Sequence, residues 1–287
     1  MQAHIAVFTL HYTMPGPLSA TFCPLDIGTK QAICSLVHMK KLRKGPRYRM
    51  STNQPSASAQ RVMVIMAHPD DVDFICAGTI AVYTTAGARV EYVLATSGNR
   101  GSHDPEMTPE KLAALREAEQ LAAAEALGVA EVTFLRHNDG EVEANIPMRR
   151  ELAGIIRKGR PDIVFTFDPW QHYQVHPDHR AIGQATLDAI ADARMPMYYP
   201  EQISGEVRDH RVRDVYFFAT DHPNHWVDIT ATMEKKIAAL KCHASQVGDR
   251  DIGQLMRARA RTVGQEQGVL YAEAFKHLPM VQPTLPS

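Results

Sequence analysis

The sequence of 287 residues predicts an α/β fold, in which a Rossmann-like, mainly parallel sheet is sandwiched by helices in a single domain. Two observations lead to this prediction. First, short apolar runs such as Val62–Ala67 contain no polar residue at helical spacing, which is typical of a strand buried on both faces. Second, helix-like stretches lie between these runs and give the crossovers of about 20 residues that parallel strands need.

Helix start and stop signals locate the first elements. The strand at 62–67 is followed by a helix over 71–86 that ends at Gly87, a residue suited to a helix C-terminus. A second strand is expected at 89–95, and Thr108 with Pro109 opens a long helix over 109–127. The later elements are expected at strand 131–135, helix 148–157, strand 163–167, helix 180–193, strand 212–219, helix 228–243 and helix 252–263.

The domain is expected to cover residues 61–287, with residues 1–60 as a disordered N-terminal extension. Seven Lys and Arg residues but only one acidic residue occur in 1–49, and residues 50–60 have the composition of a polar linker. A solvated basic run is the commoner outcome for such a segment, although a membrane-surface or nucleic-acid tail is an alternative. We hypothesise that the translated protein starts at Met50.

The composition excludes several classes of protein. A net charge of −1 gives no global preference for nucleic acid, and no apolar stretch approaches the roughly 20 residues of a membrane span. The chain has no Walker-type phosphate loop and no Gly-x-Gly-x-x-Gly, which disfavours a nucleotide cofactor. Its four cysteines form no Cys-x-x-Cys pair and fit a reducing compartment, so a cytoplasmic protein is expected.

A polar cluster begins where the first strand ends, at His68-Pro69-Asp70-Asp71. In open parallel sheets the carboxyl ends of the strands form the ligand crevice. Imidazole and carboxylate groups are both good ligands for Zn²⁺ and similar ions, so His68 and Asp71 could supply two of the three ligands of a catalytic site. A helix cap with carboxylates near the helix N-terminus would explain the motif equally well if it stood alone.

A second cluster, His176-Pro177-Asp178-His179, follows the predicted strand at 163–167 in the same way. Pro177 fits the first turn of the next helix, and the i,i+3 spacing places His176 and His179 on one face. Each motif alone is weak evidence, but two of them at the carboxyl ends of core strands favour a shared metal site. The spacing does not decide between His176 and His179 as the third ligand.

Together these motifs resemble the PIG-L/LmbE-type N-acetylglucosaminyl deacetylases, which are zinc-dependent enzymes. The resemblance covers about residues 61–276 and extends to further motifs, which are Thr96–Gly98 with Gly101, Arg116–Glu119, Leu127–Val129, Asn138–Gly140, Arg160–Asp162 and Lys241–Gln246. Two positions depart from the family pattern. Asp73 stands where many members carry glutamate, and Gln174 stands where some place a tyrosine that assists the oxyanion.

The resemblance implies a metal-dependent hydrolase that deacetylates an N-acetylated sugar conjugate or a related small molecule. Its metal ligands would be His68, Asp71 and His179, holding Zn²⁺ or another divalent ion such as Fe²⁺. Asp70 would be the general base.

The remaining roles are assigned on the same resemblance. A protonated His176 would stabilise the oxyanion or protonate the departing amine, and Asp178 is expected to orient His176 and raise its pKa. Arg116 is a candidate for substrate binding, with a surface pair to Glu119 as the alternative. A homo-oligomer is also implied.

Two rival functions share these motifs. One is an amidase of thiol conjugates or natural-product intermediates, which would need the same ligands. The other is a non-catalytic module that binds metal or sugar, against which the presence of both Asp70 and His176 argues. The loops at 96–109 and 168–175 would distinguish substrates. In the second loop, Trp170 or Tyr173 could stack on a sugar face or simply pack on the core.

Overall fold

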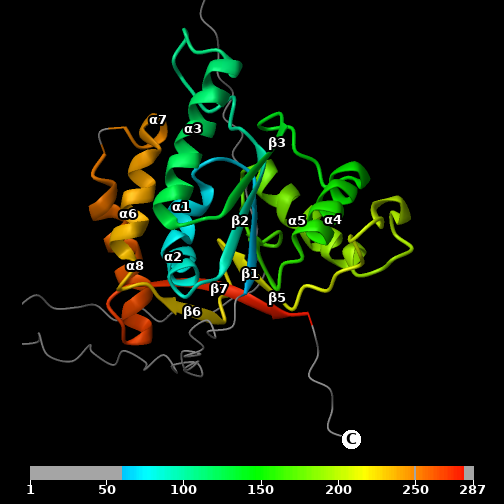
Figure 1. Cartoon of the computed structure of the whole chain (residues 1–287). Helices are drawn as coiled ribbons and strands as arrows, with labels where there is room; N and C mark the ends of the chain where they lie inside the picture. Colours follow the sequence, from blue (N-terminus) through cyan, green and yellow to red (C-terminus); the bar gives the residue numbers. More distant parts are fainter. Residues whose placement is uncertain (1–59, 249, 281–287) are drawn as a thin grey trace, which may run out of the picture. The chain divides into compact units, whose positions relative to one another are not determined.

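The computed structural model describes residues 60–248 and 250–280, so the predictions for residues 1–59 lie outside it. The described residues form a seven-stranded sheet in the order β3-β2-β1-β4-β5-β7-β6 (Figure 1). The strands are β1 (Arg61–Met66), β2 (Arg89–Thr96), β3 (Glu131–His137), β4 (Ile163–Phe167), β5 (Asp214–Phe218), β6 (His225–Asp228) and β7 (Ala272–Pro279). Strands β1 to β5 are parallel to one another, whereas β7 pairs antiparallel with both β5 and β6. The predicted, mainly parallel α/β fold is therefore confirmed.

Helices cover both faces of this sheet (Figure 1). They are α1 (Asp71–Ile75), α2 (Ala77–Thr85), α3 (Pro109–Leu127), α4 (Ile146–Gly159), α5 (Pro177–Ala193), α6 (Met233–Cys242), α7 (Ala244–Val247) and α8 (Ile252–Gln267), with a short 3₁₀ turn at Pro200–Gln202. Helices α4 and α5 lie side by side on one face, while α2, α3 and α6 pack together on the other. The central strands β1 and β4 are buried between these layers.

The predicted helix signals act as expected at α3 and α5. The Thr108 hydroxyl accepts a hydrogen bond from the backbone N–H of Lys111, at 3.3 Å, and Gly128 ends the helix in the left-handed region. Pro177 occupies the first turn of α5, directly after the N-cap residue His176. These caps determine where each helix begins next to the carboxyl edge of the sheet.

The helix expected over 71–86 is interrupted at Cys76, so this prediction was wrong in part. The carboxylate of Glu273, on β7, accepts hydrogen bonds from the backbone N–H groups of Gly78 and Thr79 and so caps a new helix, α2. Lys236 donates to the backbone carbonyl of Phe74 near the end of α1 and pairs with Glu273 at 2.6 Å. A buried ion pair therefore satisfies the backbone groups that the break exposes.

The C-terminal part of the sheet also differs from the prediction. The helix expected from Asp228 begins at Met233, because His225–Asp228 forms the edge strand β6. The segment Ala272–Pro279 was not predicted as a strand, yet it lies between β5 and β6. Its partners are distant in the sequence, so local periodicity did not indicate it. No described helix is both long and apolar enough to cross a bilayer.

Candidate metal centre

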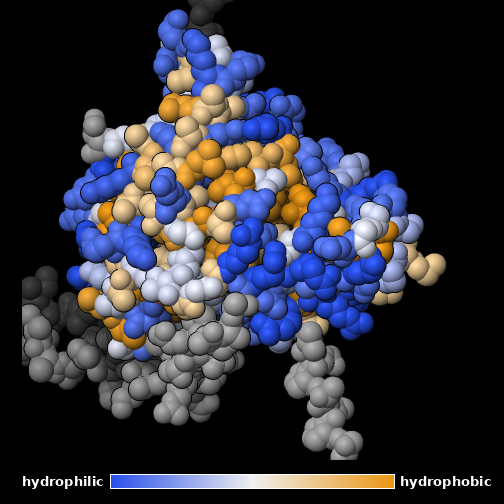
Figure 2. All heavy atoms as spheres, viewed as in Figure 1, coloured by the Kyte–Doolittle hydropathy of each residue, from blue (hydrophilic) through white to orange (hydrophobic). Residues whose placement is uncertain are grey.

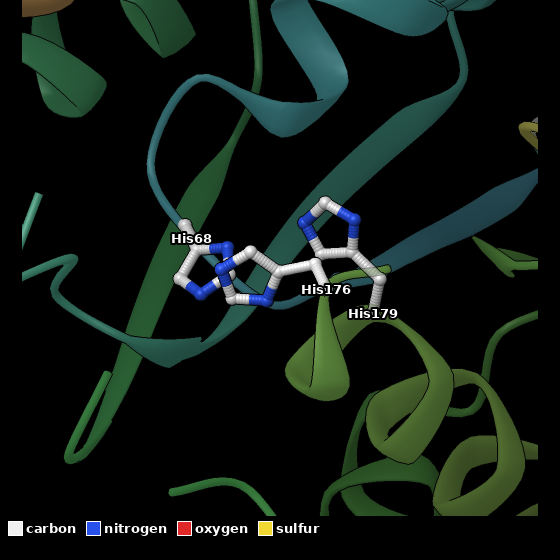
Figure 3. A group of neighbouring side chains, drawn as sticks. All are labelled: His68, His176 and His179. Atoms are coloured by element: carbon white, nitrogen blue, oxygen red, sulfur yellow. The ribbon is translucent and has the colours of Figure 1, made fainter. Parts of the chain in front are cut away.

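The two predicted histidine clusters meet at the carboxyl edge of the sheet. Because β1 and β4 are parallel neighbours, the loop after β1 and the start of α5 lie at the same end of the strands. Figure 3 shows the imidazole rings of His68, His176 and His179 gathered there. The ring centroids lie 4.5 Å apart for His68 and His176, and 5.2 Å apart for His68 and His179. The sheet thus brings together residues that are more than 100 positions apart in the sequence.

Asp71 lies between the two histidines that the resemblance assigns as metal ligands. One carboxylate oxygen is 3.2 Å from Nε2 of His179, and the other is 3.5 Å from Nδ1 of His68. The second oxygen also accepts a hydrogen bond from the backbone N–H of His68, at 2.8 Å. Burial would raise the pKa of Asp71, but the hydrogen bonds from His179 and His68 hold it well below its usual range. Asp71 is therefore an ionised carboxylate at neutral pH.

Two other sets of side chains could also contribute metal ligands. Ligand atoms of His68, His176 and His179 lie within 4.8 Å of one another, and so do those of His68 with Asp139 and Asp178. Both sets include His68, which is 6 % exposed. The donors are imidazole nitrogens and carboxylate oxygens, a mixture that suits Zn²⁺ and Fe²⁺ better than Mg²⁺ or Ca²⁺.

Two buried carboxylates orient the ring of His68. Its Nε2 lies 2.9 Å from Asp178 and 3.2 Å from Asp139, and the pKa of both carboxyls is lowered by their hydrogen bonds to His68, against the effect of burial. Since an ionised carboxylate can only accept, Nε2 carries the proton and Nδ1 faces Asp71. Burial would lower the pKa of His68, but its three carboxylate partners raise that pKa to about 11. This arrangement is typical of the carboxylates that orient metal-binding histidines.

The expected role of Asp178 was wrong in one respect, because its carboxylate holds His68 and not His176. The first turn of α5 directs this fully buried side chain toward the loop after β3, where Gly140 and Val142 donate their backbone N–H groups at 2.7 and 3.2 Å. The pKa of His176 is lowered, by burial and by the charges of the neighbouring histidines. The neutral imidazole is thus favoured, in contrast to the protonated form expected from the sequence.

Asp139 was not recognised as a site residue. The segment Asn138–Gly140 was interpreted as a turn, but it follows β3 and reaches the same carboxyl edge of the sheet. Asp139 is 8 % exposed and takes hydrogen bonds from the main chain of Arg100 as well as from His68. An acidic residue directly after a parallel strand was the signal that could have identified it.

Asp70 has a conformation and an environment that differ from those of its neighbour Asp71. Its φ of 84° lies in the left-handed region, and its backbone N–H donates to the side chain of Gln120 at 2.9 Å. Burial and the adjacent negative charge of Asp71 raise the pKa of Asp70 to about 7, although Arg116, 3.3 Å away, opposes the rise. A carboxyl group with a pKa near neutrality can exchange protons readily at physiological pH.

Arg116 is 4 % exposed, so the structure does not support a direct contact with substrate. Its guanidinium donates to the backbone carbonyls of Gly98 and Pro69, at 3.0 and 2.7 Å, as well as to Asp70. The alternative, a surface pair with Glu119, is wrong, because Arg116 is buried and the Glu119 carboxylate accepts hydrogen bonds from Ser245. Arg116 instead fastens the loops after β1 and β2 to each other. A Cβ at Gly98 would lie 2.2 Å from this guanidinium, so a larger residue there would have to displace the guanidinium from its hydrogen bonds.

The motif Lys241–Gln246 supports the same loop from the α6–α7 junction. His243 is fully buried, and its Nε2 lies 2.9 Å from the carboxylate of Asp73. Gln120 donates to that carboxylate at 3.1 Å while its carbonyl accepts from Asp70. A chain of buried hydrogen bonds therefore connects the C-terminal helices to Asp70.

The aromatic loop at 168–175 lies at the surface. Trp170 is 60 % exposed, with its ring 5.9 Å from that of Phe217, and Tyr173 is 97 % exposed with a φ of 59°. Gln174 accepts a hydrogen bond from the backbone N–H of His176 at 3.2 Å. Either aromatic ring is accessible to a ligand, but neither contacts the three histidines.

The sequence matches the model of the PIG-L family, described as GlcNAc-PI de-N-acetylase, over residues 63–190. It is 35% identical over 231 residues to the diacetylchitobiose deacetylase of Thermococcus kodakarensis, with 79% of this chain and 86% of the relative covered. The chain belongs to the PIG-L family. This assignment confirms the resemblance that the two histidine motifs indicated.

Two further relatives of this PIG-L protein support the assignment. One is the 1D-myo-inositol 2-acetamido-2-deoxy-alpha-D-glucopyranoside deacetylase of Mycobacterium sp., 30% identical, with 68% of this chain and 76% of the relative covered. The other is the crystal structure of N,N'-diacetylchitobiose deacetylase from Pyrococcus horikoshii, which is 33% identical with a TM-score of 0.75 and covers 79% of this chain and 86% of that chain. All three relatives are deacetylases of N-acetylglucosamine-type compounds by name.

Proposed function

We propose that this PIG-L protein is a metal-dependent hydrolase that removes the acetyl group from an N-acetylglucosaminyl-type sugar conjugate. The observation that carries the proposal is the position of Asp71 between His68 and His179, directly beside the carboxyl group of Asp70. These four side chains would supply three metal ligands and one proton acceptor at the same edge of the sheet. The names of the relatives support the substrate class.

The proposed metal ligands are Nδ1 of His68, Nε2 of His179 and the carboxylate of Asp71. Zn²⁺ is the preferred ion, and Fe²⁺ suits the same donors. When bound, the metal supplies a Lewis acid that lowers the pKa of a water molecule to about 7 and polarises the acetyl carbonyl. Asp178 and Asp139 support binding because they accept the hydrogen bond of Nε2, so Nδ1 is the nitrogen on which the metal would replace the proton of His68.

Asp70 is the proposed general base and then the general acid. Its carboxylate takes a proton from the attacking water as the new C–O bond forms at the acetyl carbon. It returns this proton to the sugar nitrogen as the C–N bond breaks, which releases acetate and the free amine. A single group with a pKa near 7 can perform both transfers.

His176 is the proposed donor to the oxyanion. Its Nδ1 is buried without a hydrogen-bond partner, and its ring lies 4.6 Å from that of His179. The lowered pKa favours a neutral ring, which stabilises the developing negative charge by donating a hydrogen bond and not by carrying a full positive charge. This role differs from that of Asp70 because His176 need not change its protonation state.

Acetate release from a panel of N-acetylglucosaminyl compounds tests the proposal. The panel includes N,N'-diacetylchitobiose, an N-acetylglucosaminyl inositol, an N-acetylated thiol conjugate and an N-acetylated glycopeptide. Activity on the sugar compounds that disappears with a chelator and returns with Zn²⁺ is expected. Preference for the thiol conjugate or glycopeptide would favour the rival amidase function. Tight metal binding without acetate from any compound would favour a non-catalytic binding module.

A further inference from the structure

Arg100 lies beside the candidate metal centre. One carboxylate oxygen of Asp139 accepts from His68 at 3.2 Å, and the other accepts from the backbone N–H of Arg100 at 3.3 Å. A single carboxylate thus links the two residues. The side chain of Arg100 is 48 % exposed, whereas His68 and Asp139 are buried. Arg100 is therefore at the boundary between the metal centre and solvent, where the part of a substrate beyond its acetyl group would lie.

The loop that carries Arg100 is held in place on both sides of this residue. Before it, the backbone carbonyl of Gly98 accepts from the buried guanidinium of Arg116 at 3.0 Å. After it, Gly101 packs closely against the same guanidinium, where an added Cβ would lie 2.7 Å away. Nη1 of Arg100 itself donates to the backbone carbonyl of Asp139 at 3.0 Å. The position of Arg100 is thus set before a ligand binds, which lowers the entropy cost of binding.

Glu141 reaches Arg100 from the loop after β3. The backbone N–H groups of its neighbours Gly140 and Val142 both donate to the buried Asp178. The side chain of Glu141, between them, projects to the surface and is 53 % exposed. Its Oε1 lies 2.6 Å from Nη2 of Arg100. The Arg100–Glu141 pair therefore bridges the loops after β2 and β3 next to the metal centre.

This pair is equipped to bind hydroxyl groups. Within the described residues, Nη1 and Nη2 of Arg100 make one contact each, and a guanidinium has further N–H donors to offer. Hydrogen bonds from Asn138 and Arg100 lower the pKa of Glu141, so its carboxylate is ionised and accepts from a hydroxyl. An exposed ion pair contributes little to stability, so a ligand can share its groups at little loss. Figure 2 shows mostly hydrophilic residues where the loop before α3 projects from the molecule, which suits such polar contacts.

The charge around the pair disfavours a negatively charged ligand. The loops 97–108 and 138–145 contain five acidic residues, and Arg100 is their only lysine or arginine. Because Glu141 lies 2.6 Å from Arg100, this one positive charge is already compensated. A carboxylate on a substrate would therefore meet a net negative field, whereas an uncharged hydroxyl group would not.

We propose that Arg100 and Glu141 determine specificity by binding hydroxyl groups of an uncharged unit attached to the N-acetylglucosaminyl group, and by disfavouring conjugates that carry carboxylates. A second sugar and an inositol both have this chemistry. The proposal rests on the proposed deacetylase function, because that function places the acetyl group at the metal centre. It adds the class of conjugate and the two residues that select it. Neither residue contacts the reacting atoms, so both act on binding and not on the chemical step.

Binding measurements on the full-length protein loaded with Zn²⁺ test this proposal without turnover. Isothermal titration calorimetry in the Asp70→Asn background gives the Kd of four compounds. They are N-acetylglucosamine, N,N'-diacetylchitobiose, an N-acetylglucosaminyl inositol and an N-acetylglucosaminyl malate, of which the last carries two carboxylates. Acetate release by the protein with Asp70 intact is measured in parallel, which reports on the proposed function separately.

We expect the disaccharide and the inositol conjugate to bind at least about tenfold more tightly than N-acetylglucosamine, and the malate conjugate to bind most weakly of the three conjugates. Arg100→Met should reduce the tenfold preference to about threefold or less. Glu141→Gln keeps the shape of the side chain and removes its charge, so it should bind the malate conjugate about threefold more tightly. Arg257→Met removes an exposed ion pair with Glu234 and is the matched control, which should keep both preferences.

The outcomes separate the specificity proposal from the proposed function. Equal binding of the three conjugates, a preference that survives Arg100→Met, or a malate affinity unchanged in Glu141→Gln would overturn the specificity proposal, even if acetate is released. The expected preferences without acetate from any compound would overturn the deacetylase function alone. Circular dichroism checks that each variant is folded. Glu141→Gln leaves the contact between Arg100 and Asp139 intact, so its effect does not arise from a disturbed loop.

Discussion

Replacing Asp70 by Asn separates its proposed role from metal binding. Asparagine is nearly isosteric, tolerates the left-handed φ of 84° and keeps an oxygen that can accept from Arg116. The backbone bond from this residue to Gln120 is unaffected. The fold and the metal site should therefore survive. What the variant loses is a proton acceptor, and general acid–base catalysis is worth about 10²–10⁴ in rate, or about 3–5 kcal/mol.

The assay is acetate release, with kcat/KM measured between pH 5 and 9 and metal content measured in parallel. Asp70 must be ionised to accept a proton, and its pKa is raised to about 7. In the wild type, kcat/KM should thus increase with pH and then level off. The midpoint of this rise should lie at or below about pH 7, since a bound cation lowers the pKa of Asp70. Asp70→Asn should bind metal normally, lose 10²–10⁴ in kcat/KM and lack this rise. The matched variant Asp71→Asn should lose metal instead.

Two results would refute the reasoning. If Asp70→Asn loses metal as strongly as Asp71→Asn, then Asp70 acts as a ligand and not as a base. If Asp70→Asn retains kcat/KM within about threefold of the wild type, another group accepts the proton.

Three further predictions concern the surroundings of the site. Asp178→Asn should weaken Zn²⁺ binding by about 10–100-fold, measured by chelator competition, because the ring of His68 loses the nearest carboxylate that orients it; unchanged affinity would argue against that role. Arg116→Met should lower kcat far more than it raises KM, because this buried side chain positions Asp70 and does not face substrate; a change confined to KM would restore it as a substrate contact. Lys236→Met leaves Glu273 as an unpaired buried charge and should lower the unfolding free energy in urea by about 3–5 kcal/mol, with Lys235→Met, an exposed neighbour, as the control.

The parts of the fold that follow local rules could be predicted from the sequence. Strands β1 and β4 are continuous buried runs, and α3 has both an N-cap and a C-terminal glycine. Strand β7 has no such signal, because Glu273 places a carboxylate among the buried residues of the strand. That carboxylate is stable there only because Lys236 and the start of α2 are its partners. Such partners are 37 and about 195 residues away, so no sequence window contains them.

The candidate site shows the same limit at the level of single side chains. The parallel order of β1 and β4 was sufficient to predict that the loop after β1 and the start of α5 would meet. It was not sufficient to predict which way Asp178 would point. Its direction depends on Gly140 and Val142, whose backbone N–H groups become available only when the loop after β3 turns back toward α5. Side-chain partners at a site thus depend on the complete sheet order.

The left-handed backbone at Asp70 explains why so much of the surrounding structure is polar and buried. In a regular helical turn, the directions of two consecutive carboxylates are related only by the helical rotation. The φ of 84° at Asp70 instead lets Asp70 point to Arg116 while Asp71 points to His179. A non-glycine residue in this region costs about 1 kcal/mol or more, so the surrounding contacts must hold it in place. Gln120 fixes its backbone N–H, and Arg116 fixes its carboxylate. The buried Gln120, Arg116 and His243 are therefore best understood as supports for one strained residue, which links the C-terminal helices to the chemistry at the carboxyl edge of the sheet.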